Sequence, residues 1–331
     1  MIEKHFIHVF ETLDSSIDLP FMISRGQEKG PKVLLTAVVH GEEVTGMEVV
    51  HRLFEQVRLA RGTLYAFPVV NLAGFQFGTR YYPYTDITAT EQPNLNLVFP
   101  GQPDGTPAER IAHAVYRTIE GIKPNLFIDL HCDAHNSIAY ILLERLVGKT
   151  NGGLERETRK LAEDFGVTVC TEHTPEDYVE DLGVQTSTGA VYNRLEIPAF
   201  TVELGGPEII RESFVRIGTN GIKNILNTLG MLKGPWEHWE SDTKIKTNYP
   251  LRSHFVYVSK KFGKISYRVK VGQPVKEGDL IATVEGVFGE KREEVRSDKD
   301  GFILALGYQV MCFPGLPVAT LAVKDEAATS N

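Results

Sequence analysis

An imidazole and a carboxylate stand three residues apart where an apolar stretch of the sequence ends. The stretch "VLLTAVV" (33–39) runs directly into His40-Gly41-Glu42-Glu43, and Gly41 allows the backbone to turn there. Imidazole nitrogens and carboxylate oxygens bind zinc, and hydrolytic zinc sites commonly have three protein ligands and an open position for water. His40 and Glu43 therefore have the spacing of two metal ligands. A capping glutamate beside a hydrogen-bonded histidine would give the same pattern.

Two further segments carry polar residues of the same kind. His131, in "DLHCDAH", supplies a candidate third ligand. Asp129 points to the same side of its strand as His131, so it either orients that imidazole or forms a separate salt bridge or cap. Glu203, in "TVELGG", is a carboxylate at the end of an apolar strand, which is costly unless it is paired or functional. It is either a general base for a metal-bound water or one half of a structural ion pair.

The elements that must position these residues alternate along the chain. Apolar runs predict strands at 33–39, 62–71, 125–135 and 199–206. Amphipathic spacing predicts helices at 42–57, 107–121, 151–166 and 208–232, with Glu42 as a first-turn carboxylate that complements the helix dipole. This alternation predicts an open α/β sheet with helices on both faces. The candidate ligands and base then meet at the carboxyl ends of the strands, where such sheets build their sites.

The character of the sequence changes after about residue 235. Residues 234–250 are polar and irregular, and from 250 onward short alternating segments are separated by Gly and Asp. This pattern predicts a linker followed by a small all-β domain. We therefore expect two domains, 1–240 and 250–325.

Charge and composition exclude several classes of protein. The chain has 331 residues, with 35 Lys and Arg against 43 Asp and Glu and a net charge of −8. We expect neither nucleic-acid nor membrane partners, because both would need a basic patch or a long apolar segment. The three cysteines lie far apart and the first residues do not have the pattern of a signal peptide, so we expect a reducing, cytoplasmic location.

Four segments in this order resemble the succinylglutamate desuccinylase/aspartoacylase family, a branch of the zinc-carboxypeptidase-like amidohydrolases. They are "HGEE" (40–43), "NLNLVFPG" (94–101), "IDLHCD" (128–133) and "TVELGG" (201–206). The resemblance implies a carboxypeptidase-like open mixed sheet and one zinc ion per chain, held by His40, Glu43 and His131. It implies Glu203 as general base and hydrolysis of the amide bond of a small N-acyl amino acid or N-acyl amine by zinc-bound water. A homo-oligomer is compatible with such an enzyme.

The same resemblance extends to the substrate, with one departure. It implies that Arg80 polarises the scissile carbonyl, and that Asn71 and Asn96 lie beside the substrate. The family's segment continues with an Arg that binds a substrate carboxylate, where this chain has Leu97. Leucine cannot make a bidentate, charge-assisted contact.

Three interpretations of Leu97 follow. The substrate lacks a carboxylate at that place, or another arginine such as Arg194 or Arg211 takes over, or catalysis is weakened. We favour the first, because the candidate ligands and base are all present. Asn94 and Asn96 either hydrogen-bond to the substrate or serve as turn residues.

Other assignments stay open. An esterase would use the same residues, a non-catalytic protein could retain the metal for ligand binding, and another divalent metal could replace zinc. The C-terminal segment resembles the barrel-sandwich hybrid of biotinyl and lipoyl carriers but lacks their modification motif, so Lys291 is expected to be unmodified. The resemblance implies that this domain restricts access to the cleft, with Tyr308 as a candidate aromatic at the site.

Overall fold

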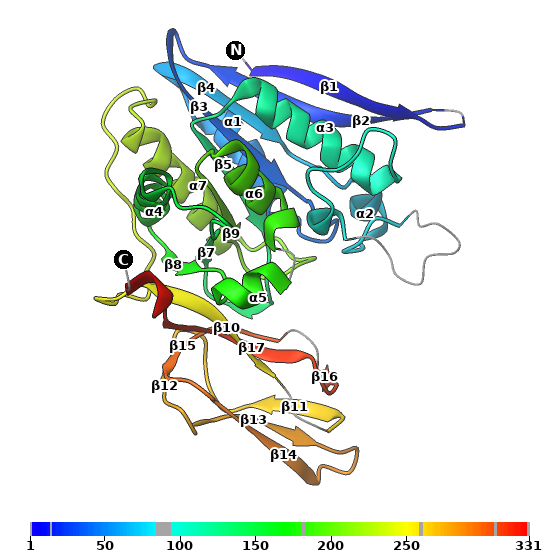
Figure 1. The fold of residues 1–331 in the computed structure, drawn as a ribbon, viewed down its shortest axis with the longest axis vertical. Coiled ribbons are helices and arrows are strands. Elements are labelled where there is room, and N and C mark those ends of the chain that lie inside the picture. Colours follow the sequence, from blue (N-terminus) through cyan, green and yellow to red (C-terminus); the bar gives the residue numbers. More distant parts are fainter. Residues whose placement is uncertain are drawn as a thin grey trace.

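One large mixed sheet runs through the protein, with helices on both faces of its N-terminal two thirds (Figure 1). The computed structural model describes residues 2–13, 15–83, 94–180, 183–257, 261–307 and 310–329, so Tyr308 lies outside the described residues. The strands are β1 (Ile2–Glu11), β2 (Ser16–Arg25), β3 (Glu28–Ala37), β4 (Arg61–Phe67), β5 (Leu126–His131), β6 (Asn136–Ser137), β7 (Tyr140–Leu143), β8 (Thr168–Thr171), β9 (Ala199–Glu203), β10 (Leu251–Tyr257), β11 (Gly263–Tyr267), β12 (Pro274–Val275), β13 (Leu280–Glu285), β14 (Lys291–Arg296), β15 (Gly301–Leu306), β16 (Met311–Cys312) and β17 (Pro317–Lys324). The helices are α1 (Thr45–Gln56), α2 (Leu72–Phe77), α3 (Pro107–Ile122), α4 (Gly152–Phe165), α5 (Pro175–Glu180), α6 (Ser187–Ala190) and α7 (Glu212–Thr228), with short turns η1 (Leu95–Leu97), η2 (Gly183–Gln185), η3 (Val191–Leu195) and η4 (Ala327–Thr329).

The sheet has the strand order β1-β2-β4-β3-β5-β9-β7-β8-β10-β17-β15-β12. Its centre, β4-β3-β5-β9, is parallel, whereas β7 is antiparallel to β9 and the β1–β2 hairpin is antiparallel to β4. The predicted open mixed α/β sheet is therefore confirmed. The parallel centre brings the carboxyl ends of β3, β5 and β9 to one edge.

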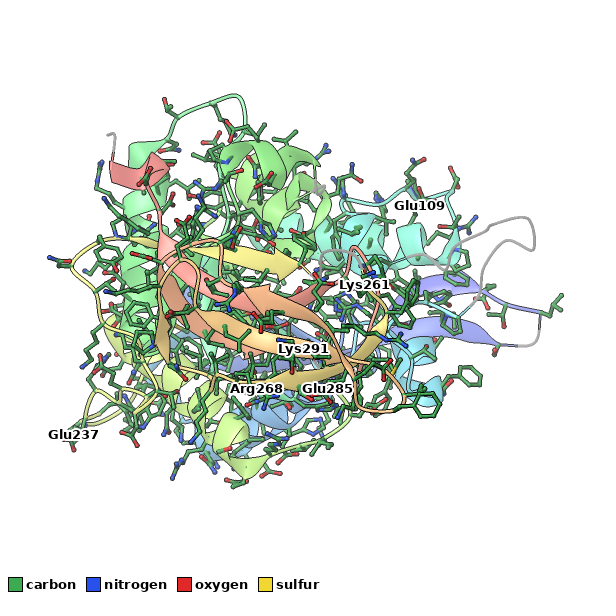
Figure 2. All side chains as sticks on the ribbon, turned by 90° about the horizontal axis from the view of Figure 1, so that it is seen from below. Glu109, Glu237, Lys261, Arg268, Glu285 and Lys291 are labelled. Atoms are coloured by element: carbon green, nitrogen blue, oxygen red, sulfur yellow. The ribbon has the colours of Figure 1, made fainter. Side chains whose placement is uncertain are left out.

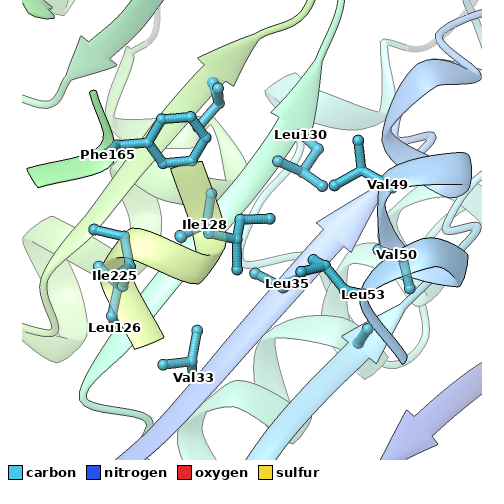
Figure 3. Packing of buried hydrophobic residues seen from close by; sticks show 14 of the residues in the cluster. Val33, Leu35, Val49, Val50, Leu53, Leu126, Ile128, Leu130, Phe165 and Ile225 are labelled. Carbon is cyan, nitrogen blue, oxygen red and sulfur yellow. The ribbon is translucent and has the colours of Figure 1, made fainter. Parts of the chain in front are cut away.

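Side chains of the central strands belong to hydrophobic cores on both faces of the sheet. Val33 and Leu35 of β3 pack on one face with α1, α4 and α7 (Figure 3). Leu34 belongs to the core on the other face, with residues of α3. Each of these β3 side chains is fully buried, and burying one contributes about 1.5–3 kcal/mol. A strand buried on both faces needs a nearly continuous apolar run, which is why "VLLTAVV" does not alternate between apolar and polar residues.

The predicted elements are present, with shifted ends. α3 begins at Pro107 behind a capping box of Thr106 and Glu109. α4 ends at Phe165 and is followed by its C-cap Gly166 in a left-handed conformation. α1 begins at Thr45 rather than residue 42, so Glu42 precedes the helix instead of lying in its first turn. The β1–β2 hairpin and the short strands β7 and β8 were not predicted, because β1 is largely exposed and β7 and β8 have four residues each.

The C-terminal strands continue the large sheet and add a second one. β10 pairs parallel with β8 at Leu251 and Cys170, and β14-β13-β11-β16 forms a separate four-stranded sheet. A third apolar core lies between the two sets of strands. The boundaries 1–240 and 250–325 and the barrel-sandwich resemblance stay predictions. Lys291, at the start of β14, donates to Glu294 Oε1 at 2.8 Å on the exposed side of this sheet (Figure 2).

Among the described helices, none combines the length and hydrophobicity that a membrane span requires.

The connection from β3 to α1 is held by close backbone packing. The positive φ in this turn belongs to Val38, at 56°, and not to Gly41. A Cβ atom on Gly41 would lie 2.0 Å from the carbonyl carbon of Gly74 in α2. Gly41 is therefore required because the backbone of α2 approaches it, and not because the turn needs a left-handed conformation at this position.

We expect Gly41→Ala to lower the free energy of unfolding by about 1–3 kcal/mol, because the added methyl group must displace backbone. Gly121→Ala is the matched control, since a Cβ on that helical glycine meets nothing within 4 Å; alanine should be neutral or stabilising there by up to about 1 kcal/mol. Urea denaturation of the two variants measures both effects. Equal stability of the two would contradict the packing argument.

Candidate metal centre

Three buried side chains converge at the carboxyl edge of the parallel strands. His40 and Glu43 follow β3, and His131 is the last residue of β5, the parallel neighbour of β3. Glu43 Oε1 lies 2.8 Å from His40 Nδ1, and Glu43 Oε2 lies 2.8 Å from His131 Nδ1. One ligand atom from each residue falls within 4.8 Å of the others, so the three could hold a metal ion.

The second nitrogen of each imidazole has its own acceptor. His131 Nε2 lies 2.9 Å from Asp129 Oδ2, and His40 Nε2 lies 3.0 Å from Asn94 Oδ1. Protons on these two nitrogens would leave both Nδ1 atoms with lone pairs directed toward Glu43. This is the arrangement in which an outer acceptor sets the tautomer and the orientation of a metal-binding histidine.

Asp129 is itself fixed by donors from two other elements. It is fully buried and accepts a hydrogen bond of 2.7 Å from Thr36 Oγ1 in β3 and another from Ser187 Oγ in α6. Burial alone would raise the pKa of Asp129, but the charge of His131 and these hydrogen bonds lower it. The carboxylate therefore stays ionised beside the imidazole.

The charge of Glu43 also fits a metal site. Burial by itself would raise the pKa of this carboxyl, but His40 and His131 hold the pKa well below its usual range. Glu43 Oε2 also accepts from the backbone N–H of Cys132 at 3.0 Å, and Oε1 accepts from Arg80 Nη1 at 2.6 Å. A buried carboxylate between two imidazole nitrogens is a donor set of the type that zinc prefers.

Glu203 lies beside this cluster at the end of β9, where it is in register with His131. Its Oε2 atom is buried and has no hydrogen-bond partner among the described residues, and within that same part of the chain Glu203 forms no ion pair. Burial raises its pKa well above the ordinary value. The carboxyl group is therefore available to a ligand in the adjoining space.

That space is a cavity of about 630 Å³, a size typical of small-molecule sites. We call it the central cavity. At one end it is lined by the candidate ligands with Arg80, Asn94 and Glu203, and elsewhere by residues from β7, α5, η2 and the C-terminal strands. The C-terminal lining residues are Ser253, Phe255, Tyr257, Gly315, Pro317 and Thr320.

The other predicted substrate residues divide into two groups. Asn94, Asn96 and Leu97 line the central cavity. Asn71 is not among its described lining residues; it is the N-cap of α2, where its Oδ1 accepts from Gly74 N at 2.8 Å. Its substrate role stays a prediction.

Neither arginine proposed to replace the missing one lines the cavity. Arg211 Nη1 donates to the backbone oxygen of His135 at 2.9 Å, and Arg194 lies in η3. Among the described residues that line the central cavity, Arg80 is the only Lys or Arg.

Some contacts at the site were not anticipated. Asn94 Oδ1 accepts from the backbone N–H of Asn96 at 3.0 Å as well as contacting His40, so it is both a turn residue and a partner of a candidate ligand. Cys132, next to His131, lines the cavity as well, and its Sγ donates to Leu204 O. Ser187 is 58 positions from Asp129 in the chain, and no local pattern signals their contact.

Comparison with known proteins gives consistent results. The model of the succinylglutamate desuccinylase/aspartoacylase catalytic domain matches residues 29–229. The chain is 25% identical over 307 residues to the N-alpha-acetyl-L-2,4-diaminobutyric acid deacetylase of Halomonas elongata, covering 91% of this chain and 84% of that protein. A succinylglutamate desuccinylase/aspartoacylase from Rhodobacter sphaeroides has a TM-score of 0.81 at 23% identity, covering 98% of this chain and 96% of that one. A metallo-carboxypeptidase from Burkholderia cenocepacia has a TM-score of 0.54 at 15% identity, over 69% of this chain and 65% of that one, which supports the carboxypeptidase-like fold.

We expect Asp129→Asn to weaken zinc affinity by about 10–100-fold, because the amide no longer holds the His131 tautomer with a full charge. Competition with a chelator of known affinity measures the loss. Asp133→Asn is the matched control: Asp133 lines the same cavity, but it accepts its hydrogen bond of 2.6 Å from Tyr140 OH and not from an imidazole. An equal loss in both variants would indicate a general effect of charge and would contradict the specific role of Asp129.

Proposed function

The chain belongs to the succinylglutamate desuccinylase/aspartoacylase family, and we propose that it is a zinc-dependent hydrolase that cleaves the amide bond of a small N-acyl amino acid or N-acyl amine. The observation that carries the proposal is the buried Glu43 carboxylate between two imidazole nitrogens, each 2.8 Å away. The unpartnered Glu203 Oε2 in the adjoining cavity supports it. The Halomonas elongata relative, a deacetylase of an N-acetylated amino acid, supports the substrate type.

In this proposal His40, Glu43 and His131 hold the zinc ion, and Asn94 and Asp129 keep the two imidazoles in place. Bound zinc would supply Lewis-acid chemistry, lowering the pKa of a water molecule to about 7 and polarising the substrate carbonyl. The donor set, with an outer acceptor beside the second nitrogen of each imidazole, fits such an ion.

Glu203 moves the proton in this scheme. It accepts a proton from the attacking water as the oxygen bonds to the acyl carbon, and it then delivers a proton to the amine nitrogen as the carbon–nitrogen bond breaks. The products are a carboxylic acid and a free amine. Its raised pKa favours holding that proton between the two steps.

Arg80 stabilises the charge that develops on the carbonyl oxygen. Its Nη1 is 2.6 Å from Glu43, so the guanidinium is anchored at the reacting end of the central cavity. A fixed guanidinium close to developing negative charge lowers the barrier without reorganisation.

Leu97 bears on the substrate rather than on the chemistry. It lines the cavity but can form no ion pair, and no other described Lys or Arg besides Arg80 lines the cavity. We propose that the substrate has no carboxylate at this position. A ligand-binding protein without turnover is the second candidate, and Leu97 is the feature that favours it. Cytoplasmic location and a homo-oligomer stay predictions.

We expect Glu203→Gln to lower kcat for a hydrolysed N-acetyl amine by about 10²–10⁴-fold, because glutamine cannot carry the proton. Zinc content, measured by metal analysis, should be unchanged. Glu237→Gln is the matched control, because Glu237 is exposed at the edge of the molecule and is not among the described cavity residues (Figure 2). This variant should behave as wild type. Full activity of Glu203→Gln with zinc bound would exclude Glu203 as the general base.

We expect Leu97→Arg to raise kcat/KM for N-acyl amino acids relative to N-acyl amines by about 10-fold or more, because a charge-assisted contact becomes available to a carboxylate. Leu97→Met controls for side-chain length without charge. Paired kinetics on N-acetyl amino acids and their decarboxylated analogues measure the ratio. No gain on carboxylate-bearing substrates would contradict our account of this position.

A further inference from the structure

We infer that the end of the central cavity away from the candidate metal centre is a subsite for a protonated amine, with Glu144 as its specificity-determining residue. The substrate would then be an N-acyl amine that carries a second, free ammonium group. This inference rests on the proposed hydrolase function and adds the substrate class to it.

The geometry of two paired strands connects the two ends of the cavity. β7 runs antiparallel to β9, with Tyr140 opposite Glu203 and Leu142 opposite Thr201. Side chains two residues apart share a face of a strand, so Tyr140, Leu142 and Glu144 lie on one side, and all three line the central cavity. Four residues of strand span about 13 Å. The cavity therefore extends along this face from the reacting end to Glu144.

Glu144 is a buried acid whose hydrogen-bond partners, among the described residues, are hydroxyl groups. It is 6% exposed, and it accepts a hydrogen bond of 2.6 Å from Tyr178 OH and another from Thr188 Oγ1. Among the described residues it forms no ion pair with a Lys, Arg or His. A carboxylate can accept about four hydrogen bonds, so two positions are left for a ligand.

Its protonation equilibrium favours a cationic ligand. Burial raises the pKa of Glu144 to about 7, although Thr188 and Tyr178 act in the opposite direction. An ionised carboxylate in such a place is costly without a positive partner. A bound ammonium group would supply that charge and stabilise the ionised form.

The neighbouring groups favour a cation as well. Glu172 follows β8 beside Glu144, since its N–H donates to Leu143 O at 2.9 Å, and it also lines the cavity, with His173 Nε2 at 3.9 Å from its Oε1. The rings of Tyr178 and Phe255 line the same region, and aromatic faces attract ammonium groups.

The one Lys or Arg among the described lining residues lies at the opposite end of the cavity. Arg80, the sole Lys or Arg among the described lining residues, lies 2.6 Å from Glu43 at the reacting end. Leu97 occupies the place where the family has a carboxylate-binding arginine. An ammonium group would therefore meet carboxylates at the far end of the cavity, and a carboxylate would be repelled there.

The test uses zinc-loaded protein and three series of N-acetylated amines, which differ in the group at the far end of the chain: an ammonium, a methyl or a carboxylate group. Each series contains compounds with four, five and six methylene groups. We expect kcat/KM for the best ammonium-ended compound to exceed that of its methyl-ended analogue by about 10–100-fold, the range for a hydrogen bond to a charged group. The carboxylate-ended analogue should be the poorest.

Glu144→Gln isolates the subsite. The ratio of kcat/KM between ammonium-ended and methyl-ended compounds should fall to about 1, because the amide keeps the shape of the side chain but has no charge. The change should be a higher KM for the ammonium-ended compounds, with kcat unaltered. Glu237→Gln should keep the wild-type preference. Should Glu144→Gln fail to fold, competitive inhibition of the wild-type protein tests the same point: alkylamines should inhibit at concentrations at least 10-fold lower than alkanols of equal length.

The outcomes separate the two proposals. Hydrolysis with no preference for an ammonium end, or with a preference for a carboxylate end, would overturn the subsite and leave the hydrolase function standing. An unchanged ammonium preference in Glu144→Gln would also overturn it. If zinc is bound but no compound in the three series is hydrolysed, the proposed function fails and the subsite inference fails with it.

Discussion

A carboxylate buried between two imidazoles is the constraint on which this structure depends. Glu43 is 1% exposed, and each of its oxygens faces an imidazole nitrogen at 2.8 Å. Such a charge cannot be buried without positive or hydrogen-bonding partners. Its partners come from β5, from the loop that contains Arg80 and from a backbone N–H, so the strand order and the turns around it must all be in place before Glu43 is stable.

The sheet meets this requirement with a parallel centre. β3 and β5 are adjacent, which places His131 beside the turn after β3, and β9 then adds Glu203 in register with His131. The backbone of α2 packs against Gly41, so the turn that carries His40 and Glu43 has no room to relax. Precise positions of ligands and base thus follow from strand register and close backbone packing, and not from the side chains alone.

The antiparallel neighbour β7 gives the site its depth. A strand parallel to β9 would end at the reacting end of the cavity. β7 is antiparallel to β9, so it starts there, and Tyr140, Leu142 and Glu144 follow one another along the cavity wall. C-terminal strands complete this wall with Phe255 and Tyr257. The chemistry therefore lies at one end of the cavity, while the residues that discriminate between substrates extend along the side of it.

Much of the fold and of the candidate centre could be predicted because the signals are local. The apolar second half of β3, the amphipathic period of α1 and α3, and the spacing of His40 and Glu43 each depend on residues close in the chain. The β1–β2 hairpin escaped prediction because β1 is mostly exposed, and β7 and β8 escaped it because four residues carry little periodicity.

By itself, the sequence determined the candidate ligands, the candidate base, the open mixed sheet and the absence of an arginine at position 97. Only the tertiary structure decided which nitrogen of each histidine faces Glu43, that Ser187 and Thr36 secure Asp129, and that Asn71 caps a helix outside the cavity lining. It alone brought Glu144 to the wall of the same cavity as Glu203. The reason is physical: periodicity and spacing report the neighbours of a residue along the chain, whereas burial, charge pairing and cavity shape are set by strand order and register between segments that are far apart in sequence.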